Sequence, residues 1–173
     1  MNIFELKIWD DERRLCTFYT VQYDGDDVSE TDRFFLHLEH SEYHLAVNEL
    51  LTYVLEVIGD NHGARSYFFN RFENEVVGLP HQGRLAVKEI VYHFPHFPLR
   101  LYALRINDHI VILFGGGVKD GVTNQTSSLH LQWVEACRMA KKIEEELMSN
   151  GIIIDEINRK LIDADGNDSI MIY

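Results

Sequence analysis

The chain has 173 residues, of which 46% are hydrophobic, and its formal net charge at pH 7 is -12. This length and composition are those of one globular domain with its own core. The strong negative charge argues against sequence-independent nucleic-acid binding, because such binding depends on Lys and Arg side chains that neutralise phosphates. No apolar run approaches the roughly 18 residues of a membrane-spanning helix, and the amino terminus resembles no secretory leader. The sequence therefore predicts a soluble, cytoplasmic protein with no membrane partner.

The first half of the chain predicts a β-hairpin followed by two helices. Residues 3–9 and 15–23 are rich in aromatic and β-branched residues and are joined by a short polar link, which is the pattern of a hairpin. Ser29, with Asp32 three residues later, predicts the start of a short helix. Ser41 is expected to cap a longer amphipathic helix that ends near residue 59.

The second half predicts three strands and a long helix. After an irregular segment with one helical turn, strands are expected at 84–94, 99–106 and 109–114, the last two as an antiparallel hairpin. Apolar residues at alternating spacings of four and three predict a helix over 127–149. We thus expect a single α+β domain with an antiparallel sheet, helices packed on it and extra terminal hairpins. Its amino-terminal hairpin, core and carboxy-terminal hairpin are expected at residues 1–25, 29–149 and 152–173.

Residues 84–119 are the only net-positive part of the chain, with five basic and two acidic side chains. A local cationic site can attract an anion even on an acidic protein, because a Debye length of about 8–10 Å limits the reach of distant charges. We expect Arg100, Lys119 and Lys88 to come from three adjacent strands. Tyr102 should lie on the same face as Arg100, since alternate strand residues share a face.

The stretch HIVILFGGGVKDG, residues 109–121, has no nucleotide-binding motif. A phosphate-binding loop needs G-x-x-x-x-G-K-[ST], whereas Lys119 follows Val118 and precedes Asp120. No helix is expected to begin there, as a dinucleotide fingerprint would require. The glycines are therefore predicted to end a strand and to leave Lys119 at the rim of the sheet, with no cofactor.

Five histidines have positions that suggest metal ligands, but their context predicts no metal site. They are His37, His40, His44, His93 and His96. Metal ligands converge from a rigid frame, whereas the first three are split by the expected helix cap, and the last two lack a clear carboxylate or cysteine partner. No G-x-S-x-G elbow is present to suggest a serine hydrolase.

The segment PLRLYALRINDHIVILFGGGVKDG, followed by a helix with WVEACRMAKKI, resembles the RelE/ParE superfamily of bacterial toxins, in particular its HigB-like and phage-derived toxin-like branch. The shared features are Arg100 near the start of a strand, a tight NDH turn, an apolar strand ending in small residues and Lys119, and a helix with Ala136 and Ala140 on its core face. The resemblance extends over about residues 84–145. It implies a small RelE-like α+β fold with two amino-terminal helices packed on an antiparallel sheet.

The same resemblance implies a toxin of a type II toxin-antitoxin system that cleaves mRNA on the ribosome without a metal and is neutralised by a cognate antitoxin protein. Arg100 and Lys119 would then hold the scissile phosphate. Tyr102, His93 and Arg105 would be the candidates for proton transfer. The chain is longer and more acidic than is usual in this family, so a catalytically inactive protein-binding module of the same fold is the alternative.

Overall fold

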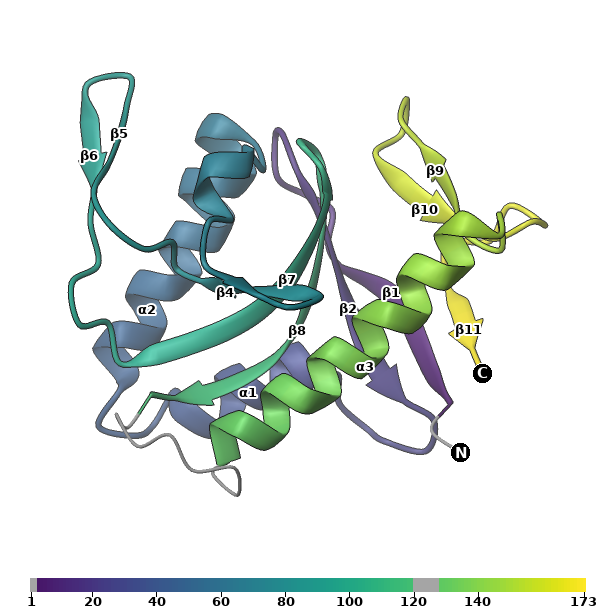
Figure 1. Ribbon diagram of the computed structural model, residues 1–173, viewed down its shortest axis with the longest axis horizontal. Coiled ribbons are helices and arrows are strands. Elements are labelled where there is room, and N and C mark those ends of the chain that lie inside the picture. Colours follow the sequence, from purple (N-terminus) through teal and green to yellow (C-terminus); the bar gives the residue numbers. More distant parts are fainter. Residues whose placement is uncertain (1–2, 120–127) are drawn as a thin grey trace.

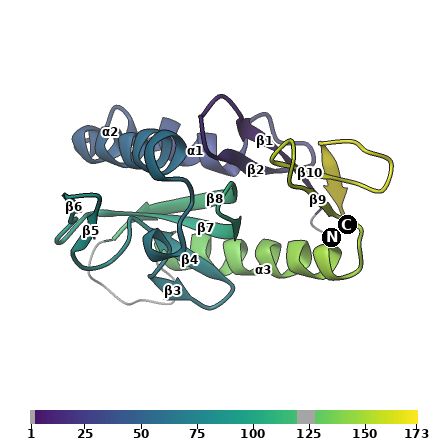
Figure 2. The same cartoon turned by 90° about the horizontal axis from the view of Figure 1, so that it is seen from above.

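The computed structural model describes residues 3–119 and 128–173, which form an α+β fold with a central sheet between two helical layers. Helices α1 (Glu30–Leu38) and α2 (His44–Thr52) lie on one face of the sheet. The long helix α3 (Ser128–Met148) crosses the other face, as Figures 1 and 2 show. Within the described residues, none of the helices has the length and apolar character needed to cross a bilayer.

The central sheet has seven strands in the order β11-β1-β2-β8-β7-β4-β3. Its strands are β1 (Phe4–Asp10), β2 (Thr17–Tyr23), β3 (Phe72–Glu73), β4 (Val76–Leu79), β7 (Leu99–Asn107), β8 (Ile110–Val118) and β11 (Ile170–Ile172). The expectation of a purely antiparallel sheet is wrong at one position, because β2 pairs with β8 in parallel. All other pairs in this sheet are antiparallel. The predicted hairpin of β1 and β2 is confirmed. It joins the rest of the central sheet through β2.

The first helix is capped as predicted, but the second is not. The Ser29 hydroxyl accepts a hydrogen bond from the Asp32 amide. Ser41 lies in the link between helices, where its hydroxyl donates to the Leu38 carbonyl, and α2 begins at His44. The helix then continues as the π-helical segment η1 (Tyr53–His62). It ends at Gly63, four residues later than predicted, where a φ of 80° favours glycine.

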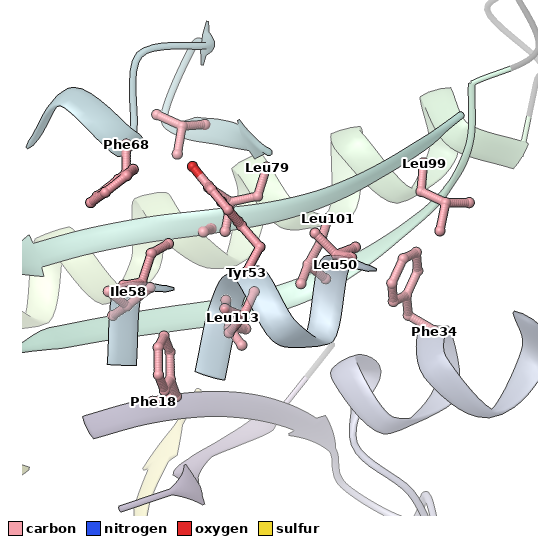
Figure 3. Close-up of a cluster of buried hydrophobic side chains, with 14 of the residues drawn as sticks. Phe18, Phe34, Leu50, Tyr53, Ile58, Phe68, Leu79, Leu99, Leu101 and Leu113 are labelled. Carbon is pink, nitrogen blue, oxygen red and sulfur yellow. The ribbon is translucent and has the colours of Figure 1, made fainter. Parts of the chain in front are cut away.

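The two faces of the sheet bury separate apolar clusters. One cluster joins α1, α2 and η1 to the sheet, and Figure 3 shows its central side chains. They include Phe18, Phe34, Leu50, Tyr53, Ile58, Phe68, Leu79, Leu99, Leu101 and Leu113. The other cluster packs Ala136, Met139, Ala140 and Ile143 of α3 onto the opposite face. Alternate strand residues supply the two clusters, as a sheet buried on both sides requires.

The prediction of one strand over 84–94, adjacent to the strand that carries Arg100, is wrong. The segment is a separate two-stranded hairpin of β5 (Leu85–Val87) and β6 (Ile90–Tyr92). Its turn is at Lys88 and Glu89, whose φ angles of 49° and 69° turn the chain back on itself. Lys88 therefore does not lie on a strand adjacent to that of Arg100, contrary to the prediction.

The segment expected to be irregular contains a short 3₁₀ turn, η2 (Ser66–Phe68), and the unpredicted hairpin of β3 and β4. The predicted β7–β8 hairpin is confirmed. Helix α3 is also confirmed over its described length, while residue 127, its expected start, lies outside the described residues. The terminal hairpin is confirmed as β9 (Ile153–Asp155) and β10 (Lys160–Ile162), after which β11 pairs with β1.

Candidate functional site

Three charged side chains converge over Gly78 on the face of the sheet that carries α3. Gly78 pairs with Tyr102 of β7, and its amide donates to the Arg71 carbonyl. A Cβ built on Gly78 would lie 2.9 Å from Arg71 Cδ, 3.0 Å from Glu73 Oε2 and 3.3 Å from Arg100 Cδ. The missing side chain thus leaves the space in which two arginines and a carboxylate meet.

Glu73 is the carboxylate of this cluster, and among the described residues one of its oxygens has no hydrogen-bond partner. Its Oε2 atom is buried and unpaired. Burial raises the pKa of Glu73, while Arg100, Arg71 and Lys119 act in the opposite direction. A buried, unpaired carboxylate oxygen among cations is a group that can accept a proton from a ligand.

Arg100 lies at the back of the site, with only 6% of its surface exposed. Its Nη1 atom donates to the carbonyls of Phe97 and Leu99 at 3.2 and 2.9 Å. Burial and the neighbouring Arg71 lower its pKa, whereas Glu73 raises it. Arg100 is thus held in place by backbone acceptors and supplies positive charge from beneath the surface.

Lys119 is the exposed cation of the cluster. Arg100 pairs with Gly117, and the Lys119 amide donates to the Pro98 carbonyl at 2.6 Å, which extends the ladder past β8. Since Lys119 is two residues beyond Gly117, its side chain shares a face with Arg100. The structure therefore brings Lys119 and Arg100 to one end of the β7–β8 hairpin.

Tyr102 is on the same face as Arg100, as predicted from their spacing. It is only 3% exposed and belongs to the α3 side of the core. Burial raises its pKa, and Glu73 adds to that effect. A phenol in this environment stays protonated and contributes packing under the cluster.

Arg105 and His93 interact with residues outside this cluster. Arg105 points to the opposite face, where it donates to the Ala64 carbonyl and pairs with Asp108 at 2.5 Å. His93 is exposed in the segment after β6 and acts electrostatically on His81. Within the described residues, no interaction joins either of them to Glu73.

The glycines of β8 let α3 pack closely beside the site. A bulge in β8 shifts its register against β7, and Cβ atoms at Gly115 and Gly117 would point to Gln132 and Leu129 of α3. At Gly116 a Cβ would lie 1.9 Å from the Arg100 carbonyl oxygen. The prediction that the glycines end the strand is wrong, because β8 continues through them to Val118. They lie at and beyond the bulge, where they bring the Arg100 backbone against β8.

Helix α3 borders the cluster on its other side. The Trp133 indole donates to the Glu73 carbonyl at 3.0 Å, and the Cys137 thiol donates to the same oxygen at 3.6 Å. Both contacts hold the short strand β3 in place. The backbone of Glu73 is thereby held between the sheet and the first half of α3.

Sequence reasoning missed Arg71 and Glu73, the two residues that complete the cluster. They lie in a segment with no clear periodicity, and β3 has only two residues. The available signal was the alternation of Arg71 and Glu73 ahead of Val76 and Val77, which places both charged side chains on one face of a hairpin.

A second polar network lies on the far side of the sheet, between η1 and β6. The Tyr53 hydroxyl is 2.6 Å from His81 Nδ1, and His81 Nε2 is 3.1 Å from the Tyr92 carbonyl. Because a carbonyl only accepts, Nε2 carries the proton and Nδ1 accepts from Tyr53. His62 Nε2 lies 3.0 Å from the Tyr92 hydroxyl.

Acid is expected to destabilise the protein through this network. Burial lowers the pKa values of His81 and His62 below the ordinary 6.5. The unfolded chain therefore binds more protons below about pH 6.5, so the free energy of unfolding falls as the pH drops from 6.5 through the folded pKa values. Thermal unfolding between pH 7.5 and 5 should show a falling Tm. The decrease in Tm per pH unit should be smaller in His81→Gln than in the wild type. It should be unchanged in His40→Gln, whose side chain is 91% exposed. An equal decrease in Tm per pH unit in both variants would contradict this assignment.

Comparison with known proteins gives this chain no relative. No protein-family model matches it, and neither a curated protein nor a solved structure does.

Proposed function

We propose that this protein is a metal-independent endoribonuclease of the RelE/HigB-like toxin type, neutralised by a partner antitoxin. The observation that carries the proposal is the unpaired Glu73 Oε2 beside Arg71 and Arg100 over Gly78. RNA cleavage without a metal needs a base for the ribose 2′-hydroxyl and positive charge at the phosphate. This cluster supplies both types of group within a few ångströms.

The proposed reaction is an internal transfer of the phosphoryl group. Glu73 takes the proton of the 2′-hydroxyl, whose oxygen forms a bond to phosphorus. The bond from phosphorus to the 5′-oxygen breaks, and that oxygen takes a proton from water. The products are a 2′,3′-cyclic phosphate and a 5′-hydroxyl end. Lys119 and Arg71 reach the surface and would contact the phosphate, while the buried Arg100 adds charge behind them.

The arrangement of the core elements also supports this proposal. Strand β2 is followed by α1 and α2 on one face, then by the antiparallel strands β4, β7 and β8, and α3 covers the other face. A sheet with two preceding helices packed on it is what the family resemblance implies. The parallel β2–β8 pair and the terminal strands are additional to that expectation.

Induced expression in a bacterial host tests the proposal. The wild-type chain should arrest growth and yield mRNA fragments with 5′-hydroxyl ends, mapped by end-specific sequencing. Lys119→Ala should lower cleavage by about 100-fold, the cost of losing one group that stabilises the transition state. Lys141→Ala, which removes an exposed lysine from α3, should cleave like the wild type. Equal activity of the two variants would remove Lys119 from the site.

The net charge of -12 favours one alternative, a binding module with the same core and no nuclease activity. An acidic surface repels the rRNA and mRNA backbones. If folded wild-type protein neither arrests growth nor generates new mRNA ends, the nuclease proposal is rejected and the binding module is favoured.

A further inference from the structure

The β5–β6 hairpin is separate from the central sheet. It forms a two-stranded sheet of its own, which stands apart from the seven-stranded sheet in Figures 1 and 2. In the described part of the chain, no backbone–backbone hydrogen bond links residues 84–94 to another segment. An isolated two-stranded hairpin is at best marginally stable in water. The hairpin therefore depends on the side chains that hold it against the helical layer.

Both ends of the hairpin have a residue about which the chain can turn. Residues 80–82 are fixed by hydrogen bonds to Asn70 and Arg71. Gly83 follows directly, with a φ of 79° and no atom within 4 Å of the position of a Cβ. At the other end His96 has a φ of 56°, and the residue after it is buried. Hinges are commonly a few loop residues of this kind between fixed segments.

Two histidines hold the hairpin through Tyr92 of β6. His81 Nε2 donates to the Tyr92 carbonyl at 3.1 Å, and His62 Nε2 lies 3.0 Å from the Tyr92 hydroxyl. The other nitrogen of His81 accepts from Tyr53. His62 Nδ1 is buried and has no hydrogen-bond partner in the described part of the chain. A charged imidazole needs an acceptor at each nitrogen, so these surroundings suit two neutral rings.

The charges around the two histidines also oppose a second proton on either ring. Burial lowers the pKa of both, and the charged side chains that act on them lower it further. One of these cations is Lys88 at the turn of the hairpin, so a charged His62 repels the hairpin itself. The others are Arg65, Arg71 and His93. The carboxylates of η1 and the hairpin are Glu56 and Glu89, which are exposed, and Asp60, which pairs with Arg13.

We propose that the β5–β6 hairpin is a flap that opens about Gly83 and His96 when His62 and His81 take up protons. In the closed form a charged His62 has no acceptor at Nδ1. A charged His81 forces the phenol that now donates to it to turn its hydrogen away. In the open form both rings reach water, while the central sheet stays folded. The proposal does not depend on nuclease activity.

The direction of the pH dependence follows from the lowered pKa values of the closed form. The closed form keeps its full advantage above the ordinary histidine pKa of 6.5, and loses it as the pH falls through the closed-form pKa values. Each proton taken up on opening changes the closed–open equilibrium by up to about tenfold per pH unit. Opening uncovers Tyr53 and Phe68, which are 1% and 0% exposed in the closed form. The rings of Phe94 and Tyr92 cover them at centroid distances of 5.0 and 6.0 Å.

Hydrogen exchange of the full chain, followed by mass spectrometry at pH 7 and pH 5.5, tests the flap. Each rate is compared with the intrinsic rate of an unstructured chain at the same pH, so the chemical effect of pH on exchange cancels. At pH 7 the amides of residues 84–94 should be protected, but less than those of residues 99–118. Between pH 7 and pH 5.5 the protection of residues 84–94 should fall at least about tenfold. Residues 99–118 should stay the better protected segment at both pH values.

Histidine variants test the assignment of the protons. His62→Gln should reduce the fall in protection of residues 84–94, and His62→Gln combined with His81→Gln should limit it to about threefold or less. His40→Gln is the matched control, because this side chain is 91% exposed, and it should keep the wild-type fall. The change with pH separates titration from lost packing, which lowers protection at both pH values. If the double variant does not fold by circular dichroism, His62→Gln alone still gives this comparison.

Three outcomes overturn the proposal. Equal protection of residues 84–94 and 99–118 at both pH values means that the hairpin opens only when the whole chain unfolds. Unchanged protection of residues 84–94 between pH 7 and pH 5.5 means that it stays closed in acid. A wild-type fall in His62→Gln, or in the folded double variant, assigns the protons to other groups.

Discussion

Glu73→Gln is expected to lower RNA cleavage by roughly 100- to 10,000-fold, the usual loss when a general base is removed. Glutamine keeps the shape of the side chain but cannot take the proton of the 2′-hydroxyl. Because Glu73 is partly buried with a raised pKa, the neutral replacement should leave the thermal unfolding temperature close to that of the wild type. The measurement is the number of new 5′-hydroxyl mRNA ends after induction, at matched protein levels.

The matched control for this prediction is Glu56→Gln. Glu56 is an exposed carboxylate on η1, in the helical layer on the other face of the sheet. The same chemical change at this position should leave cleavage unaltered. Retention of full cleavage by Glu73→Gln would show that Glu73 is not the base, even if the protein is a nuclease.

The pH dependence gives an independent test of the same role. A general base works when it is ionised, so the cleavage rate should rise with pH through the pKa of Glu73. Arg100, Arg71 and Lys119 each lower that pKa. Lys119→Ala should therefore move the acid limb of the pH–rate profile to higher pH. A loss of rate with no such movement would mean that Lys119 and Glu73 act at separate places.

The sequence predicted the cationic half of the cluster because regular elements carry it. The β7–β8 hairpin has long apolar strands and a short polar turn, so the shared face of Arg100 and Tyr102 follows from strand alternation. The opposite placement of Arg105 follows in the same way. These inferences depend only on local periodicity.

The acidic half was missed because its position depends on pairing between distant segments. Glu73 reaches Arg100 only through the pairing of β3 with β4 and of β4 with β7. A two-residue strand has no measurable period. The prediction for Lys88 was wrong because this residue lies in a continuous run of strand-forming residues. That run gave no sign of the turn at Lys88 and Glu89. Strand propensity alone does not show where a run folds back.

Gly116→Ala is expected to be the most destabilising single-methyl substitution on the candidate site. Its Cβ would lie 1.9 Å from the Arg100 carbonyl oxygen and 3.0 Å from Leu101 Cα. Both contacts are backbone atoms of the neighbouring strand, so no side-chain rotation relieves them. Overpacking in a well-packed region costs about 1–3 kcal/mol, and we expect the upper end of that range. In a chain of this size, this loss corresponds to a fall in Tm of about 6–12 °C.

The neighbouring glycines provide the controls that make this test specific. An added Cβ at Gly117 meets nothing closer than Leu129 Cδ1 at 3.6 Å, an ordinary van der Waals contact, so Gly117→Ala should change Tm little. At Gly115 the near atom is Gln132 Oε1 at 2.5 Å, the end of a side chain that can rotate away. The expected order of destabilisation is therefore Gly116, then Gly115, then Gly117. Equal unfolding temperatures for Gly116→Ala and Gly117→Ala would contradict the close approach of β8 to Arg100, on which the geometry of the whole cluster depends.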